Sequence, residues 1–147
     1  PIKIIRIFNT YGPFMQPDDG RVVSNFITQA INNLPITIYG NGMQTRSFCY
    51  IDDLISSLYK YMKLDNQFTG PINIGNPKEQ TVKSLALQII RLTNSKSKII
   101  YKKIPSDDPF NRKPSISKAK KILNWRPEID INTGLKKTIK YFQSINI

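Results

Sequence analysis

The amino-acid sequence predicts an α/β fold. Short runs of β-branched and other apolar residues alternate with longer segments in which apolar residues recur at helical spacing. Glycine or proline closes several of the short runs, as is typical where strands end. Because no low-complexity linker or internal repeat interrupts the 147 residues, we expect residues 1–147 to form one compact unit.

The short apolar runs are predicted to be strands. The first begins almost at the first residue and ends in the turn-forming sequence NTYGP at residues 9–13. A strand that starts without a preceding turn suggests that the chain continues something upstream. The expected strands are residues 2–8, 36–39, 47–50, 71–75 and 98–104.

The longer periodic segments are predicted to be helices. The expected helices are residues 22–33, 54–64, 82–92, 116–124 and 132–144. Asp18 and Asp19 suit the amino-terminal end of the first, and Thr81 is expected to cap the third. The last should be buried through Leu135, Ile139 and Phe142. Residues 105–114 are expected to form a polar loop.

Composition excludes several classes of site. The chain has no histidine and one cysteine, so histidine triads, cysteine metal clusters and internal disulfides are excluded, and we expect no metal. No run of about 20 apolar residues predicts a membrane span. The first residues do not resemble a signal peptide, so a cytoplasmic location is expected.

The net charge of +12 raises the alternative of nucleic-acid binding. Residues 75–147 carry 16 of the 22 Lys and Arg residues but 5 of the 10 Asp and Glu residues. Most of the excess is lysine on predicted helices, where a solvated face is the ordinary reason for it. We therefore favour a lysine-rich surface without a nucleic-acid partner.

Five motifs carry a resemblance to a known family. In order they are RIFNTYGP at residues 6–13, DGRVVSNF at 19–26, IYGNGMQTR at 38–46, INIGNP at 72–77 and DDPFNRKP at 107–114. Together they resemble the second half of the extended short-chain dehydrogenase/reductase family, most closely its UDP-glucuronate decarboxylases. The resemblance covers essentially the whole chain and implies a Rossmann-type fold, of which this chain holds the last sheet strands and the small mixed substrate-binding domain.

The resemblance also implies parts that this sequence lacks. The family's glycine-rich dinucleotide fingerprint does not occur in residues 1–147, and we assign none of these residues to its tyrosine–lysine catalytic pair. They are expected upstream of Pro1, in a missing or separate NAD-binding half. The cofactor of the parent enzyme is expected to be NAD, and the full enzyme is a candidate homodimer.

The motifs give candidate residues for the substrate. Asn9 follows a strand, where ligands of α/β sheets bind, and its amide can both donate and accept hydrogen bonds. Arg21, Val22 and Ser24 open a helix, whose free N–H groups attract phosphate. The family places Thr37 and Tyr39 beside the uracil base and Thr10 near the nicotinamide of NAD.

Arginines are the strongest candidates. Arg46 is implied to reach the diphosphate, and its planar fork matches two phosphate oxygens. The resemblance implies a catalytic role for Arg112, because the arginine at this position in related decarboxylases is assigned as a catalytic acid. An arginine is a poor acid, so we expect it to stabilise the enolate electrostatically or to deliver a proton from water, with phosphate binding as the alternative. Asn73 is a weaker candidate, with a structural role equally open.

Other conspicuous residues have structural explanations. Asp52 and Asp53 look like a catalytic pair but are expected to cap a helix. Cys49 is expected to be a buried small apolar residue and Tyr11 a packing residue. Phe14 stands where the family usually has an arginine, so a ligand contact is expected to be lost there.

The predicted function is that of the substrate-binding portion of an NAD-dependent UDP-glucuronate decarboxylase, inactive alone. One alternative is a nucleotide-sugar 4,6-dehydratase or 4-epimerase. Another is a non-catalytic binding remnant or a split-gene subunit that pairs with a separate Rossmann chain.

Overall fold

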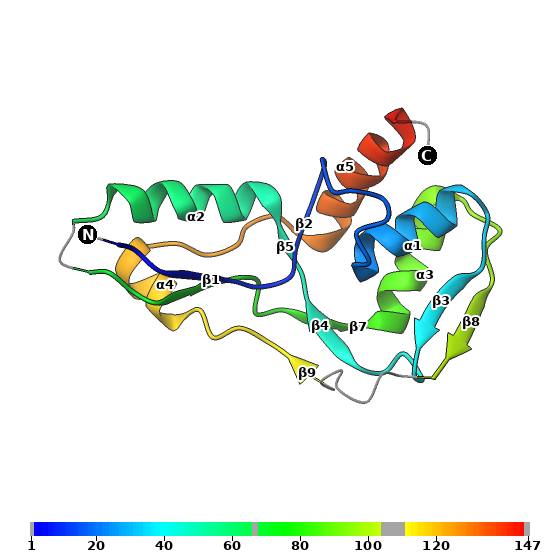
Figure 1. Ribbon diagram of the computed structural model, residues 1–147, viewed down its shortest axis with the longest axis horizontal. Coiled ribbons are helices and arrows are strands. Elements are labelled where there is room, and N and C mark those ends of the chain that lie inside the picture. The colour runs from blue at the N-terminus through cyan, green and yellow to red at the C-terminus, as the bar shows by residue number, and fades with distance from the viewer. Residues whose placement is uncertain (1, 66–67, 104–110, 146–147) are drawn as a thin grey trace.

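Two groups of elements lie at opposite ends of the molecule (Figure 1). The computed structural model describes residues 2–65, 68–103 and 111–145. One end, here called the first lobe, contains β1 and β6 with α2 and α4. The other, the second lobe, contains α1, α3 and α5 with β3 and β8. Helices and parallel strands occur in both lobes, which confirms the predicted α/β class.

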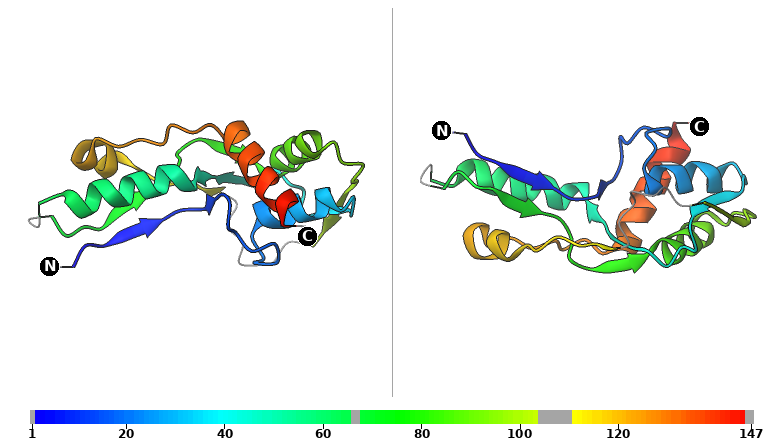
Figure 2. Two further views of the ribbon diagram at one scale, coloured as in Figure 1. Left: turned by 90° about the horizontal axis from the view of Figure 1, so that it is seen from above. Right: turned by 60° about the horizontal axis from the view of Figure 1, so that its bottom comes forward.

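The first lobe is built on one parallel strand pair. β1 (Ile5–Ile7) pairs with β6 (Ile72–Ile74), with Ile5 opposite Ile72 and Ile7 opposite Ile74. α2 (Ile51–Lys63) and α4 (Ser117–Leu123) lie at this end in every view (Figure 2). Their buried apolar side chains and those of β6 form one core with Trp125.

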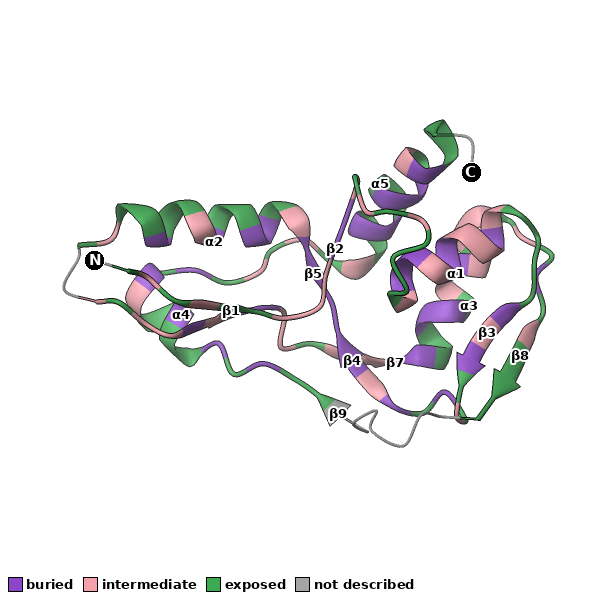
Figure 3. Cartoon of the chain, in the orientation of Figure 1, coloured by how far each residue is buried: buried purple, intermediate pink, exposed green. Residues whose placement is uncertain are grey.

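The second lobe has a larger core. β3 (Ile36–Tyr39) pairs in parallel with β8 (Ile99–Lys102). α1 (Val22–Ile31), α3 (Val82–Thr93) and α5 (Ile131–Ser144) pack together through their buried faces, which Figure 3 shows in purple. The apolar stripe predicted for each helix is therefore the face that the fold buries.

Short strands connect the lobes. β2 (Thr10–Tyr11) pairs in parallel with β5 (Cys49–Tyr50). A three-stranded sheet has β4 (Thr45–Ser47) at its centre, antiparallel to β7 (Glu79–Thr81) and parallel to β9 (Asn111–Arg112). The strands β4 and β5 cross between the two lobes (Figure 1).

The structure corrects several predicted boundaries. The strand expected at 2–8 is limited to Ile5–Ile7, and the one expected at 47–50 is two strands, β4 and β5. The turn at 9–13 and the loop at 105–114 each contain a two-residue strand, β2 and β9, although residues 104–110 lie outside the described part. Strands this short have no periodicity, since pairing with a distant partner forms them.

Asp52 and Asp53 do not cap α2 as predicted. The N-cap is Tyr50, which makes no side-chain capping bond. Asp53 is buried, and its two carboxylate oxygens accept hydrogen bonds from the backbone N–H groups of Glu128 and Ile129, each at 3.0 Å. Asp52 is exposed and forms an ion pair with Lys137. Both acids still lie in the first turn, where negative charge favours a helix.

Asp130 is a true N-cap, at α5. Its carboxylate accepts hydrogen bonds from the side chain and backbone N–H of Thr133 and from the N–H of Asn132, and these bonds lower the pKa of Asp130. A lowered folded-state pKa means that the stabilisation is present above the ordinary value of 3.8 and is lost as the pH falls through the folded pKa.

We therefore expect Asp130→Ala to lower the free energy of unfolding by about 1 kcal/mol at pH 7. The difference from the wild type should shrink as the pH falls below 3.8, the ordinary pKa of this carboxyl. Urea unfolding at pH 7, 4 and about 2.5 measures it. Asp130→Asn is the control, because asparagine also caps helices but has no charge to titrate. A pH-independent loss in Asp130→Ala would contradict the expectation.

Candidate functional site

A cavity of about 750 Å³ lies where the connecting strands meet the second lobe. Elements from both halves of the sequence form its wall, so no single motif builds it. The lining residues are Ile7, Asn9, Thr10, Met15, Gly20, Arg21, Val22, Val23, Asn25, Phe26, Thr37, Tyr39, Gln44, Arg46, Phe48, Val82 and Arg112. The arginine, threonine and tyrosine candidates are all among them: Thr10, Arg21, Thr37, Tyr39, Arg46 and Arg112.

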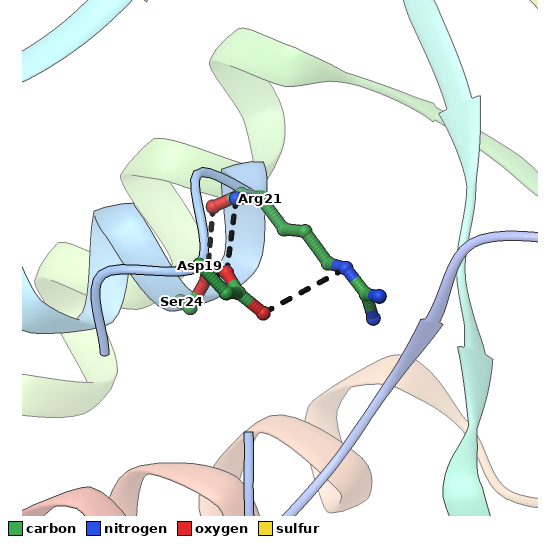
Figure 4. Close-up of polar contacts among 3 residues, drawn as sticks. All are labelled: Asp19, Arg21 and Ser24. Carbon is green, nitrogen blue, oxygen red and sulfur yellow. Dashed lines mark hydrogen bonds and ion pairs between the residues drawn. The ribbon is translucent and has the colours of Figure 1, made fainter. Parts of the chain in front are cut away.

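The loop before α1 brings Arg21 to the cavity, and Figure 4 shows the contacts of this loop with Asp19 and Ser24. One carboxylate oxygen of Asp19 accepts hydrogen bonds from the Arg21 N–H at 3.0 Å and from the Ser24 hydroxyl. The other lies 3.7 Å from Arg21 Nε, and the Arg21 side chain is 66% exposed. The loop is thus fixed by Asp19 while the guanidinium of Arg21 stays accessible.

Ser24, predicted to contact the ligand, is not among the residues that line the cavity. Its side chain is fully buried, and its hydroxyl donates to Asp19 and to the backbone carbonyl of Arg21 at 3.0 Å. Both contacts hold the loop that carries Arg21 and Val22, which do line the cavity. Ser24 therefore supports the cavity wall through these hydrogen bonds without lining the cavity itself.

β3 brings Thr37 and Tyr39 to the cavity, and β4 brings Arg46. Gln44 fixes the turn between β3 and β4, because its buried side-chain amide donates to the backbone carbonyl of Tyr39 at 2.6 Å. The backbone carbonyl of Gln44 in turn accepts from the N–H of Val82 at 3.1 Å. The sequence analysis did not identify Gln44. Its position between the glycine turn at residues 40–42 and Arg46 was a usable signal.

Arg46 and Arg112 are neighbours across the sheet. They face each other in the parallel register of β4 and β9, so both side chains leave the sheet on the same side and both line the cavity. Arg46 is nine-tenths buried, and its Nη1 donates to the Thr45 carbonyl at 2.8 Å. Arg112 is exposed. Two positively charged side chains thus line this part of the cavity, and such a wall attracts multiply charged anions.

Of the remaining candidates, two line the cavity and one does not. Asn9, predicted to contact the substrate, and Thr10, predicted to lie near the nicotinamide, both line the cavity, Asn9 after β1 and Thr10 on β2. Thr10 Oγ1 donates to the Phe8 carbonyl at 3.2 Å. Asn73 does not line the cavity; its side-chain amide donates to the Ser115 carbonyl at 3.2 Å, which is the structural role left open above. The apolar lining residues Met15, Phe48 and Val82 were missed, because their side chains look like ordinary core residues in the sequence.

Cys49 and Tyr11 pack in the interior, which confirms both predictions. Burial raises the pKa of the Cys49 thiol to about 12, with a smaller contribution from Asp53. A thiol of this kind is protonated at neutral pH and is a poor nucleophile. Burial also raises the pKa of Tyr11.

Phe14 stands outside the cavity wall. It is 84% exposed with a backbone φ of 67°, and its ring centroid lies 4.9 Å from that of Tyr141.

In the described ranges, histidine, cysteine, aspartate and glutamate nowhere gather in a group of three or more that could hold a metal ion. Among the same residues, no helix has the length and apolar character needed to cross a bilayer.

Known proteins with similar sequences and structures exist. UDP-glucuronic acid decarboxylase 1 of Arabidopsis thaliana is 48% identical over 143 residues, which are 97% of this chain and 32% of that protein. The chain thus spans about a third of the length of the curated relatives it matches.

Two solved structures share the fold. UDP-glucuronic acid 4-epimerase of Bacillus cereus, in complex with UDP-glucuronic acid and NAD, matches with a TM-score of 0.91 at 29% identity, over 99% of this chain and 46% of that one. UDP-glucose 4-epimerase of Thermotoga maritima with UDP-glucose has a TM-score of 0.91 at 27% identity, over 97% and 46%. These matches confirm the predicted Rossmann-type α/β fold.

The sequence model of the NAD dependent epimerase/dehydratase family matches residues 1–75, which include β1, β2, the Asp19 loop and the Arg46 strand. The motifs, the fold and this match agree: the chain belongs to the NAD dependent epimerase/dehydratase family.

Proposed function

We propose that this chain is the substrate-binding portion of an NAD-dependent UDP-glucuronate decarboxylase, which converts UDP-glucuronate to UDP-xylose and carbon dioxide. The observation that carries the proposal is the pair Arg46 and Arg112, side by side on the wall of one cavity. A nucleoside diphosphate sugar offers the multiply charged anion that such a wall favours. The 48% identity to a decarboxylase, against 29% to a UDP-glucuronic acid 4-epimerase, supports the choice of reaction.

The other lining residues suit the rest of the ligand. Arg21, with its accessible guanidinium at the start of α1, is placed for the ribose or diphosphate. Tyr39 and Thr37 line the same cavity and offer a ring face and a hydroxyl to the base. Asn9 can donate to and accept from sugar hydroxyls. Each assignment is a proposal that follows from position and chemistry.

Arg112 has two roles in this proposal. Its primary role is to hold the diphosphate with Arg46, because the two residues are paired in register. It also stabilises the negative charge of the enolate left on the sugar when carbon dioxide departs. A guanidinium keeps its proton near neutral pH, so electrostatic stabilisation suits it better than proton donation.

We propose that this chain contributes only a small part of the NAD site. Thr10 and Asn9 line the cavity and are the residues that would border the nicotinamide. NAD, when bound, would supply the hydride acceptor and donor for C4 of the sugar. We propose that a separate or preceding NAD-binding half supplies the rest of that site. The exposed Ile4 and Ile7, at 50% and 53%, and the pairing of β1 with β6 alone among the described strands support a covered β1 edge in the full enzyme.

UDP binding tests the substrate assignment. We expect UDP and UDP-glucuronate to raise the Tm of the 147-residue chain, since a ligand at about 100 times its Kd stabilises by about 2.7 kcal/mol. Uridine, which lacks the diphosphate, is the control and should stabilise much less. No Tm shift with either nucleotide, together with tight, salt-sensitive binding to nucleic acid, would favour the lysine-rich surface as the functional one.

The reaction is tested by product analysis with the NAD-binding half added. UDP-xylose and carbon dioxide are expected. A 4-keto-6-deoxy sugar without carbon dioxide would instead indicate a 4,6-dehydratase, and UDP-galacturonate a 4-epimerase. Binding of UDP without turnover by the combined halves would indicate a binding remnant.

A further inference from the structure

Glu79 is on β7 and Arg112 is on β9, at opposite edges of the three-stranded sheet. The Glu79 carboxylate nevertheless reaches across the central strand β4 toward β9. One carboxylate oxygen accepts a hydrogen bond from Thr45 Oγ1 on the central strand at 2.7 Å. The other lies 3.3 Å from Nζ of Lys113, the residue after Arg112. Because side chains alternate along a strand, Thr45 faces away from Arg46, and the Glu79 carboxylate lies on the side of the sheet opposite the cavity.

Two further contacts hold the chain that follows Lys113. Pro114 packs so closely on Gly75 that a Cβ built on that glycine would lie 2.9 Å from Pro114 Cγ. Asn73 donates its side-chain amide to the Ser115 carbonyl at 3.2 Å. Residues 113, 114 and 115 are therefore each fixed by a residue of the segment 73–79.

β9 needs such anchors. It is two residues long, lies at the edge of its sheet, and carries the exposed Arg112. The direction in which Arg112 leaves the sheet is set by its backbone, and therefore by the contacts of the residues beside it. Of the three anchors, the Lys113–Glu79 ion pair is adjacent to Arg112.

We propose that Glu79 is a positioning residue, which acts through Lys113 to hold β9 against β4 and so keeps Arg112 beside Arg46 for the diphosphate. The proposal rests on the proposed function. Hydrogen bonds from Thr45 and Lys113 lower the pKa of Glu79, so the carboxylate is charged at neutral pH, as the ion pair requires.

The test uses the 147-residue chain with two measurements. The first is hydrogen exchange of the Arg112, Lys113 and Ser115 amides without ligand, which should quicken several-fold in Glu79→Gln. The second is the Kd for UDP by calorimetry. Glu79→Gln should weaken binding about 3- to 10-fold, and Arg112→Met about 10- to 100-fold. If Glu79 acts through Arg112, Glu79→Gln should add nothing in the Arg112→Met background.

Asp52→Asn is the control, because it removes a carboxylate–lysine ion pair, to Lys137 at 3.8 Å, away from the cavity. It should change neither measurement. Both variants should keep a Tm within about 2 °C of the wild type, since exposed ion pairs contribute little to stability. An unchanged Tm in Glu79→Gln would show that a loss of UDP affinity comes from the position of Arg112 and not from a less stable fold.

Two outcomes would overturn the inference: unchanged exchange in Glu79→Gln, or an equal loss of UDP affinity with and without Arg112. Failure of the wild type to bind UDP would remove the proposed function instead. In that case the exchange rates alone would still decide whether Glu79 anchors β9.

Discussion

Replacing Asp53 with alanine is expected to lower the free energy of unfolding by about 2–4 kcal/mol. The side chain is 6% exposed, and its carboxylate is the acceptor for the backbone N–H groups of Glu128 and Ile129, each at 3.0 Å. Alanine leaves both N–H groups without this acceptor in a partly buried place, which costs more than the loss of an exposed bond.

The effect should be large because Asp53 fixes a connection between the lobes. Its backbone carbonyl also accepts from Trp125 Nε1 at 3.0 Å. Residues 125–129 lead from α4 in the first lobe to α5 in the second (Figure 1). One residue at the start of α2 therefore determines the path of this segment through both its side chain and its backbone.

Urea unfolding followed by tryptophan fluorescence measures the change, since Trp125 is the only tryptophan in the sequence and is buried beside this contact. Asp52→Ala is the matched control, because Asp52 is exposed in the same helical turn and should change stability by about 0.5 kcal/mol or less. Asp53→Asn keeps one acceptor and should fall between them. Equal losses in Asp52→Ala and Asp53→Ala would contradict this role.

The helices were predictable from the sequence because their stability depends on a local pattern. Apolar residues at helical spacing, such as Phe26 and Ile27 in α1 or Leu135 and Ile139 in α5, are the residues that the cores bury. The Thr81 cap was also predictable, and its side chain accepts from the Ser84 N–H. Each of these signals lies within a few residues of the element that it forms.

The pairing of the connecting strands could not be predicted, because their partners are far away in the sequence. Arg112 pairs with Arg46 and Thr81 with Thr45, and nothing local in these two- and three-residue strands indicates the partner. The same pairing decides which nominated residues reach the cavity. The family motifs supplied Arg46 and Arg112 separately, whereas their adjacency and the supporting contacts of Ser24 and Asn73 are properties of the fold.

The largest effect on ligand binding is expected at Arg46. Arg46→Met should weaken UDP binding about 100-fold or more, because a charge-assisted pair of hydrogen bonds is lost at a site where water competes little. Arg46 is nine-tenths buried whereas Arg112 is exposed, so the loss should exceed that in Arg112→Met. Methionine retains an unbranched stem of similar length, which limits the loss of packing.

Calorimetric titration with UDP separates a specific contact from a change in net charge. Arg91→Met, on α3 and outside the cavity wall, removes the same charge and should leave the Kd within about 2-fold, because exposed distant charges are screened by salt. Arg46→Lys should recover only part of the affinity, since an ammonium cannot reproduce the two parallel bonds of a guanidinium. If Arg46→Lys binds UDP as tightly as the wild type, the site recognises charge alone. If Arg46→Met and Arg112→Met together cost less than their separate losses imply, the two arginines hold one shared anion, as their register on the cavity wall requires.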